Sequence, residues 1–374
     1  MNKLYIVCGE YQPNSAPTNR LLSFINAFDK KGIETIVVFI APNNTRDKVL
    51  DTYQNITFSY LWEKSLIRER IYDKLVAGCR VSRFCKQLAS GAKVFLFGAS
   101  AYLHHFTSRC DINVYHERTE HPEVVRLRFA FERTRYIKSC KKLSGLFVIS
   151  TALKNYFIGI GVPAKKITIV NMTVDPTRFE DVQKDSNAEK YIAYCGTASN
   201  NKDGVDRLIK AFGIVAQKYK DLKLYIIGRI PTPDDESGNL QLVKSLGIKD
   251  QIVFTGVVPA EQMPQLLTNA TVLALARPDS LQAQNGFPTK LGEYLLTGNP
   301  VVVTKVGDIP LFLKDGESAL FAEPDNVEEF ADKLCWALEH PVEGNKIGLN
   351  GRNVAMENFD ASIETKKIIN IILG

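Results

Sequence analysis

The sequence predicts an α/β protein with two doubly wound, Rossmann-like domains that face each other across a cleft. Short apolar runs alternate along the whole chain with longer stretches of helical spacing. The runs are continuous rather than alternating, which is typical of strands buried on both faces of a parallel sheet. A length of 374 residues, at about 150 residues per domain, also favours two domains.

The expected strands form two sets of six. The first set is 4–8, 35–40, 94–97, 112–115, 146–149 and 167–170. The second set is 192–194, 224–227, 252–254, 272–275, 301–303 and 320–322. Helical spacing between strands is seen in two groups of residues: Leu21, Leu22, Ile25 and Phe28, and Val124, Leu127, Ala130 and Phe131.

The domain boundary is expected in the polar stretch 171–190, which contains Pro176 and has no sustained period. This predicts an N-terminal domain over 1–175 and a C-terminal domain over 176–355. We expect a final helix, at about 356–374, to pack back on the N-terminal domain.

The net charge of +6 hides a difference between the two halves. Residues 1–180 carry 27 Lys and Arg against 15 Asp and Glu, a net of +12, whereas 181–374 carry 20 against 26, a net of −6. The seven cysteines include no Cys-x-x-Cys pair, so neither a zinc site nor a disulfide framework is indicated. No apolar leader and no run of ~18–20 apolar residues is found, which predicts a cytoplasmic protein.

Because parallel sheets bind ligands beyond the carboxyl ends of their strands, the turns that follow strands are the candidate sites. The first such turn, 9–20, places Ser15 and Ala16 before a helix, where free backbone N–H groups would suit a phosphate. An ordinary polar loop with an N-cap is the alternative. The turn is not Gly-x-Gly-x-x-Gly, which weighs against a nicotinamide-dependent oxidoreductase.

Two further turns carry charged groups. The small-residue turn 195–204 holds Lys202 at a helix entrance, where an ammonium would neutralise a phosphate, although such a lysine is often only solvated. The segment 277–303 contains a short helix with Glu293, which ends near Gly298 before the next buried strand. A carboxylate there would accept two ribose hydroxyls, whereas a solvated surface glutamate is the alternative.

The stretch Gly286-Phe287-Pro288-Thr289-Lys290-Leu291-Gly292-Glu293-Tyr294, followed by 298–302, resembles the donor-binding signature of retaining group-1 (family-four) glycosyltransferases. These are GT-B enzymes that use nucleotide-sugar donors. Further matches occur in order along nearly the whole chain, at 149–153, 171–175, 202–209, 227–228, 253–258 and 278–280.

The resemblance implies a role for each matching residue. Glu293 would bind ribose, and Lys202 would neutralise the diphosphate. Val258 would line the base by main-chain contacts, with a strand-end packing residue as the alternative. The 286–289 backbone, from Gly286 and Phe287 to Pro288 and Thr289, would face the sugar and phosphate. No cofactor beyond the donor and no metal ion is implied, and the chain holds no Asp-x-Asp triplet.

The sequence departs from the family pattern at two positions. Asn285 stands where the family commonly has Glu, and Thr197 where it commonly has Arg. Arg229, Arg277 or Lys290 would have to supply the cation that Thr197 lacks. These departures leave open a non-catalytic nucleotide-sugar-binding subunit of a glycan assembly complex.

The N-terminal half is expected to hold the acceptor, and the stretch 113–122 offers His116, Glu117 and Glu120 as candidate catalytic residues. The alternative is a salt-bridged loop in which Arg118 pairs with Glu117 or Glu120. In retaining GT-B enzymes the resemblance suggests that the departing phosphate helps to take the acceptor proton, so that a dedicated base need not exist.

Two basic amphipathic stretches suit an anionic membrane surface, with two solvated helix faces as the alternative. They are Lys64, Arg68, Arg70, Lys74, Arg80, Arg83 and Lys86, and then Arg126, Arg128, Arg133, Arg135, Lys138, Lys141 and Lys142. No nucleic-acid motif accompanies them. The sequence therefore predicts a metal-independent retaining glycosyltransferase, peripheral at the inner face of the membrane, that transfers a sugar to a lipid-linked or polysaccharide precursor.

Overall fold

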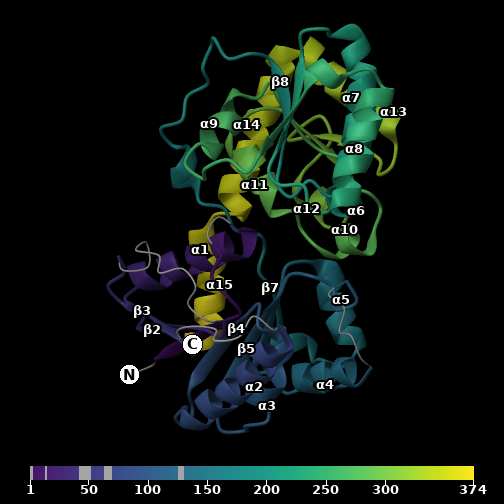
Figure 1. Cartoon of the computed structure of the whole chain (residues 1–374). Coiled ribbons are helices and arrows are strands. Elements are labelled where there is room, and N and C mark those ends of the chain that lie inside the picture. Colours follow the sequence, from purple (N-terminus) through teal and green to yellow (C-terminus); the bar gives the residue numbers. More distant parts are fainter. Residues whose placement is uncertain (1–2, 13–14, 42–51, 63–69, 125–129) are drawn as a thin grey trace. The chain divides into compact units, whose positions relative to one another are not determined.

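The computed structural model describes residues 3–12, 15–41, 52–62, 70–124 and 130–374. The chain forms two compact units, each of which is described by itself (Figure 1). Unit 1 comprises residues 1–171 and 361–374, and unit 2 comprises residues 172–360.

Unit 1 is built on a seven-stranded parallel sheet in the order β3-β2-β1-β4-β5-β6-β7. Its strands are β1 Leu4–Cys8, β2 Thr35–Phe39, β3 Ile56–Tyr60, β4 Lys93–Phe97, β5 Asn113–Arg118, β6 Gly145–Val148 and β7 Ile167–Ile169. Its α-helices are α1 Ala16–Lys30, α2 Arg70–Gln87, α3 Leu103–Thr107, α4 Ala130–Lys141, α5 Thr151–Gly159 and α15 Ala361–Leu373.

Unit 2 is built on a six-stranded parallel sheet in the order β10-β9-β8-β11-β12-β13. Its strands are β8 Tyr191–Cys195, β9 Lys223–Ile227, β10 Ile252–Gly256, β11 Val272–Leu275, β12 Val301–Thr304 and β13 Leu320–Ala322. Its α-helices are α6 Asn200–Asp203, α7 Val205–Lys218, α8 Pro233–Ser245, α9 Met263–Asn269, α10 Leu281–Asn285, α11 Thr289–Leu296, α12 Ile309–Phe312, α13 Val327–Glu339 and α14 Pro341–Asn358. Helices α7, α8 and α13 lie on one side of the sheet, and α9, α11 and α14 lie on the other (Figure 1).

Helix α1 shows how the local sequence builds unit 1. Ser15 caps its N-terminus, because its Oγ accepts a hydrogen bond from the Thr18 backbone N–H at 3.3 Å. The fully buried Phe24 and Phe28 recur at helical spacing and join the core between α1 and the sheet, where Phe24 contacts Phe95 and Phe97. Loss of one such buried phenylalanine costs about 3–5 kcal/mol of stability.

The two parallel sheets confirm the predicted fold class, and every predicted run contributes to a strand. The sequence missed β3, because its side chains alternate between Ile56, Phe58 and Tyr60 on one face and polar residues on the other. Such alternation is typical of a strand with only one covered face, and β3 lies at the edge of the sheet.

The structure differs from the expected single helix at 356–374. Helix α14 ends at Asn358 within unit 2. The residues that follow it pair with the start of unit 2, where the Val174 backbone N–H donates to the Phe359 carbonyl at 2.8 Å. Only α15 belongs to unit 1, where it packs on α1 through Ile368 and Ile372. The division between the units falls between Asn171 and Met172 rather than at 175.

Among the described residues, no helix combines the length and the apolar character that crossing a bilayer requires. All seven cysteines are free, and Cys79 and Cys110 are exposed.

Candidate functional site

Apart from Val258, which follows β10, the predicted donor residues of unit 2 follow the carboxyl ends of β8 and β11, which are neighbours in the sheet. The turn after β8 begins at Gly196, and the segment after β11 leads through α10 to α11. Gly196 and Gly228 have φ values of +141° and +127°, and a Cβ on Gly228 would collide with the Gly196 carbonyl. Two glycines are therefore required for this turn to pack against the end of β9.

Lys290, in the first turn of α11, is the cation at the Gly196 turn. Its Nζ donates to Asp203 Oδ2 at 2.6 Å and to the Tyr194 hydroxyl at 2.8 Å, and it lies 4.5 Å from the Tyr194 ring centroid. A Cβ on Gly196 would overlap the Lys290 ammonium, so the absence of a side chain there makes room for it. The ammonium is thereby fixed beside the backbone of the turn.

Asp203 is a buried carboxylate with several partners. Its side chain is 2% exposed and contacts Lys290, the Tyr194 hydroxyl at 2.9 Å and the Arg277 guanidinium at 3.8 Å. Burial by itself would raise the pKa of Asp203, but Lys290, Arg277 and the Tyr194 hydroxyl together hold it below its ordinary value. The carboxylate therefore stays ionised and keeps the two cations in place.

Glu293 lies one turn after Lys290 on α11 and is partly exposed. Its carboxylate forms an ion pair with Arg178 of the 3₁₀ helix η4 Pro176–Phe179, and Arg178 also donates to the Ala260 carbonyl at 3.3 Å. The next residue, Tyr294, is buried, and its hydroxyl contacts the backbone N–H and carbonyl of Cys195. Helix α11 is thus attached to the end of β8, which fixes the position of Glu293.

Lys202 lies in α6, close enough for its positive charge to contribute to lowering the pKa of Lys290. Its backbone carbonyl faces the Arg277 Nε at 3.5 Å. Thr197 accepts the Tyr194 hydroxyl at its carbonyl, and Asn285 donates from its amide to the Leu281 carbonyl at 2.9 Å.

The backbone from Gly286 to Thr289 joins α10 to α11. Phe287 is 7% exposed and packs on Phe312 and Phe359, so its side chain belongs to the core of unit 2. Pro288 precedes α11 at its N-cap, with Thr289 as the first helical residue. Val258 is half-buried beyond the end of β10.

The structure corrects the placement of two catalytic candidates in unit 1. His116 and Glu117 lie within β5 rather than in a loop after it. His116 is completely buried, with Nδ1 3.1 Å from the Leu96 carbonyl and Nε2 3.3 Å from Ser100 Oγ. Burial, assisted by the Arg118 charge, lowers its pKa to about 3. The imidazole is therefore neutral and enclosed in this structure, and a catalytic role for His116 stays a prediction.

Glu117 pairs with Arg20 of α1, not with Arg118. The Arg20 Nε lies 2.9 Å from Glu117 Oε1, and the same guanidinium donates to the carbonyls of Val170 and Asn171. Burial raises the pKa of Glu117 above its ordinary value, although Arg20 opposes the shift. This pair joins three segments of unit 1 and is structural.

The remaining candidates in unit 1 lie nearer the surface. Glu120 is partly exposed, and its backbone carbonyl accepts from Arg118 Nε at 2.8 Å. Ser15 is used as the cap of α1, and Ala16 is the first residue of that helix. A phosphate role for Ser15 and Ala16, and a catalytic role for Glu120, stay predictions.

The sequence did not single out Tyr194, Asp203 or Arg178 as site residues. Tyr194 is in a buried strand and Asp203 directly follows Lys202, so neither stands out from a core or surface residue by pattern. The sequence offered one signal, a charged residue directly before a glycine, and the structure shows that this glycine, Gly204, is left-handed. In the described part of the chain, no three His, Cys, Asp or Glu side chains are grouped to hold a metal ion.

Residues 189–340 match the family described as glycosyl transferases group 1. Curated relatives include an MMP α-(1→4)-mannosyltransferase of Mycolicibacterium hassiacum, 24% identical over 57% of this chain and 50% of the relative. Mannosylfructose-phosphate synthase of Agrobacterium fabrum is 23% identical over 57% of this chain and 49% of the relative. The chain spans about half the length of these curated relatives.

Solved structures match over the whole chain. HepE of Anabaena, solved with UDP and glucose, has a TM-score of 0.78 at 16% identity and covers 99% of both chains. A TarM variant of S. aureus, whose crystal also holds UDP, has a TM-score of 0.78 at 11% identity and covers 100% of both. At such identities the likeness establishes the fold, which is GT-B.

Proposed function

Because residues 189–340 carry a group 1 glycosyl transferase domain and the chain has the GT-B fold, we propose that this protein is a retaining glycosyltransferase. It moves a sugar from a nucleotide diphosphate-sugar to a hydroxyl of a lipid-linked or polysaccharide precursor. The observation that carries the proposal is the arrangement of Lys290 and Glu293 on α11, beside the turn that follows β8.

Each part of the donor is assigned to residues of unit 2 by their charge and their position. The Lys290 ammonium, assisted by Lys202, neutralises the diphosphate, and the N-terminus of α11 adds its positive dipole end. Glu293 lies one turn further along and accepts the ribose hydroxyls, in place of part of its pairing with Arg178. Val258 lines the base, and the 286–289 backbone faces the sugar.

The chain's contribution to the reaction is to position the donor and stabilise the charge that develops on the departing diphosphate. Lys290 acts at that place, because Asp203 and Tyr194 hold its ammonium before any donor arrives. No metal ion is part of the proposal, so a strict requirement for Mn²⁺ or Mg²⁺ would contradict it. The acceptor is assigned to unit 1, whose excess of cations suits an anionic membrane surface.

The departures at Thr197 and Asn285 favour one alternative, a nucleotide-sugar-binding subunit without turnover. A panel of UDP-, GDP- and ADP-sugars separates the two. The enzyme would show a thermal shift with one donor class together with transfer to an acceptor or slow hydrolysis. Tight binding without either reaction would support the subunit, and no binding at all would end both proposals.

Glu293→Ala is the first variant to measure with that panel. Loss of a charged acceptor for two hydroxyls is expected to weaken donor binding by roughly 10- to 100-fold. Glu357→Ala, which removes an exposed carboxylate from α14 of the same unit, is the matched control and should leave donor binding unchanged. Equal donor binding by wild type and Glu293→Ala would remove this residue from the site.

A further inference from the structure

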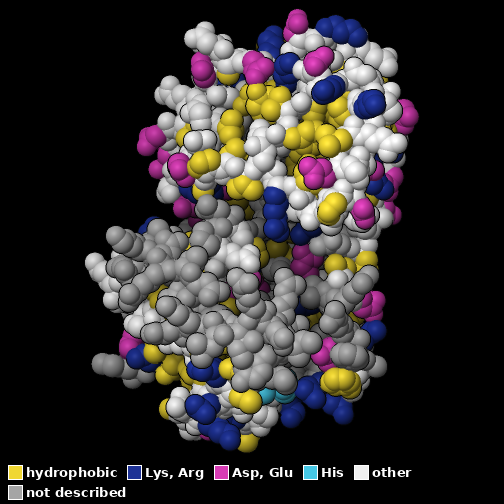
Figure 2. All heavy atoms as spheres, in the orientation of Figure 1, with side chains coloured by type: hydrophobic (Ala, Val, Ile, Leu, Met, Phe, Trp, Pro, Cys, Tyr) yellow, Lys and Arg dark blue, Asp and Glu magenta, His cyan; other side chains and the backbone are white. Residues whose placement is uncertain are grey.

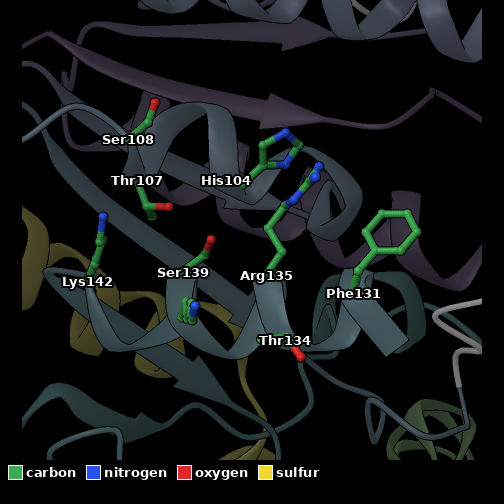
Figure 3. Close-up of a pocket in the computed structure, with 9 residues that line it drawn as sticks. His104, Thr107, Ser108, Phe131, Thr134, Arg135, Ser139 and Lys142 are labelled. Atoms are coloured by element: carbon green, nitrogen blue, oxygen red, sulfur yellow. The ribbon is translucent and has the colours of Figure 1, made fainter. Parts of the chain in front are cut away.

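A groove of about 510 Å³ lies between helices α3 and α4 of unit 1, and its lining includes none of the residues placed in the candidate site. One wall comes from α3 and the residue after it, the other from α4 and Lys142 (Figure 3). In this view the Arg135 side chain extends toward His104 across the groove. The lining residues are His104, Thr107, Ser108, Phe131, Thr134, Arg135, Lys138, Ser139 and Lys142.

Three cations line the groove in one stripe along α4 and the residue directly after it. Arg135 and Lys138 of α4 and then Lys142 are separated by three and four residues, which is the spacing of one helix face. All three are exposed, and no carboxylate in the described ranges forms an ion pair with any of them. On the same helix, Arg133 pairs with Glu123 instead.

The other polar groups of the groove contribute little charge of their own. Burial lowers the pKa of His104, as does the neighbouring Arg135, and the pKa of His105 falls to about 4, so both rings are neutral near pH 7. The Thr107 and Ser108 hydroxyls donate to backbone carbonyls of their own helix. Attraction for an anion therefore comes from the α4 cations.

The basic surface continues beyond the groove. Helix α3 packs against α2 as well as α4, and α2 presents the exposed Arg83 and Lys86. Figure 2 shows Lys and Arg side chains gathered beside a histidine in the region of α2, α3 and α4. Phe131, which lines the groove, is 57% exposed, and the Arg135 guanidinium lies 5.6 Å from its ring centroid.

We propose that the α2–α4 face of unit 1 binds the surface of a membrane that contains anionic lipids, with the α3–α4 groove taking their phosphate-bearing headgroups. Cations spread over neighbouring helices complement a two-dimensional array of phosphates better than one compact anion. An exposed phenylalanine beside them suits the boundary between headgroups and acyl chains. The inference rests on the proposed function for its setting, an acceptor held at a membrane.

The test is co-sedimentation of the full chain with phosphatidylcholine vesicles that contain or lack phosphatidylglycerol, with no sugar donor present. Because it is a binding measurement, a failure of the membrane inference is distinguishable from a failure of glycosyl transfer. Wild type should bind the phosphatidylglycerol vesicles, bind less as salt rises, and ignore phosphatidylcholine alone. Equal binding to both kinds of vesicle, or binding to neither, would overturn the inference.

Charge reversal of the stripe locates the surface. Arg135→Glu/Lys138→Glu/Lys142→Glu should weaken partitioning on the order of 100-fold. The control Lys210→Glu/Lys244→Glu/Lys249→Glu makes the same change in net charge at exposed positions of unit 2 and should retain most of the binding. Equal loss in both triple variants would mean that net charge, not this face, attracts the membrane.

Two further measurements keep the test decisive. Phe131→Ser changes no charge and should weaken vesicle binding several-fold, with an unchanged far-ultraviolet circular dichroism spectrum. Glycerol phosphate at millimolar concentration should not displace the protein from vesicles. Displacement that depends on Arg135 would instead assign the groove to a soluble phosphate compound, and preferential binding of single-stranded RNA would assign it to nucleic acid.

Discussion

Each unit contains a buried carboxylate paired with a cation, and the two pairs differ in number of partners. In unit 1, Glu117 has Arg20 as its charged partner, and the guanidinium is shared with the Val170 and Asn171 carbonyls. In unit 2, Asp203 has Lys290, Arg277 and the Tyr194 hydroxyl. Burial therefore raises the pKa of Glu117, whereas the partners of Asp203 lower its pKa.

The difference separates a structural pair from a site pair. Arg20 ties α1 and β5 to the point where the chain leaves unit 1, and both partners are at most 5% exposed. Lys290 is 15% exposed beside a glycine turn, and its carboxylate partner is over-supplied with positive charge. On the proposed function, a diphosphate that binds here would share these cations without leaving Asp203 unpaired.

The largest expected effect is on stability, from Arg20→Met. It leaves Glu117 buried without its cation and removes the Arg20 donors from two carbonyls, which is expected to cost unit 1 about 3–5 kcal/mol. Trp62 is in unit 1 and Trp336 in unit 2, and they are the only tryptophans of the chain. Urea unfolding in a Trp336→Phe background therefore reports on unit 1 alone.

The matched control for this variant is Lys30→Met, at an exposed position of α1, which should change the free energy of unfolding by less than about 0.5 kcal/mol. Nucleotide binding by the folded Arg20→Met protein should equal that of wild type. If the folded Arg20→Met protein bound nucleotide more weakly than wild type, the two buried pairs would not be independent.

Lys290→Met should lower donor affinity by roughly 30- to 100-fold, because a charge-assisted contact to the diphosphate is lost. The substitution also leaves the buried Asp203 carboxylate with less positive charge around it, so the stability of unit 2 falls as well. Adding Asp203→Asn removes that buried charge and should restore part of the stability without restoring donor affinity. Isothermal titration with the donor, beside unfolding followed through Trp336, separates the two effects.

Recovery of affinity in the double variant would show that Lys290 acts only by neutralising Asp203. Lys202→Met should then carry the diphosphate effect, as the sequence resemblance implied.

Acidification should weaken unit 1 more than unit 2. The pKa of four histidines, His104, His105, His116 and His121, is lowered by burial, and all four lie in unit 1. A histidine with a lowered folded-state pKa binds protons more readily when unfolded, so its contribution to stability is lost as pH falls below about 6.5, by at most ~1.4 kcal/mol per pH unit and group. Glu117, with its raised pKa, opposes this at the acidic end.

The measurement is the urea midpoint between pH 7 and pH 5 in each single-tryptophan background. His116→Gln should flatten the dependence of unit 1, because the amide does not titrate, and Glu117→Gln should steepen it. Identical slopes in the two units would contradict the assignment of these shifts. Asp203, with its lowered pKa, loses its contribution only below pH 3.8, so unit 2 is expected to hold through this range.

The smallest effect is expected from Arg178→Met. Arg178 and Glu293 are 31% and 23% exposed, and an ion pair at that exposure is worth about 0–1 kcal/mol. Donor affinity should therefore change by less than about fivefold, against the much larger loss for Glu293→Ala. A loss as large as that of Glu293→Ala would mean that Arg178 itself contacts the donor.

The sequence predicted the architecture well because buried parallel strands leave a strong pattern. Runs such as 272–275 and 301–303 are apolar at every position, and both are completely buried strands. Strand β3 was missed because an edge strand alternates. Gly298 was correctly placed after α11, since its φ of +73° is a conformation that glycine favours.

Side-chain partners across the sheet left no pattern in the sequence. Asp203 and Lys290 are far apart along the chain and meet only because β8 and β11 are neighbours. His116 was read as a loop residue because β5 extends past Tyr115 to Arg118 through three polar or charged positions that the fold buries. The pairing of Glu117 with Arg20 explains part of that burial, and no local pattern contains it.

The path of the chain has a consequence for synthesis. Unit 1 needs α15, whose Glu364 is buried and accepts the Asn171 backbone N–H at 2.8 Å, yet α15 follows all of unit 2 in the sequence. Unit 2 is therefore translated completely before α15 is available. Until then, the surface of α1 on which α15 packs lacks its last helix. While residues 172–373 are translated, unit 1 depends on chaperones or on its own partial stability. Truncation near residue 360 should therefore leave unit 2 folded and destabilise unit 1.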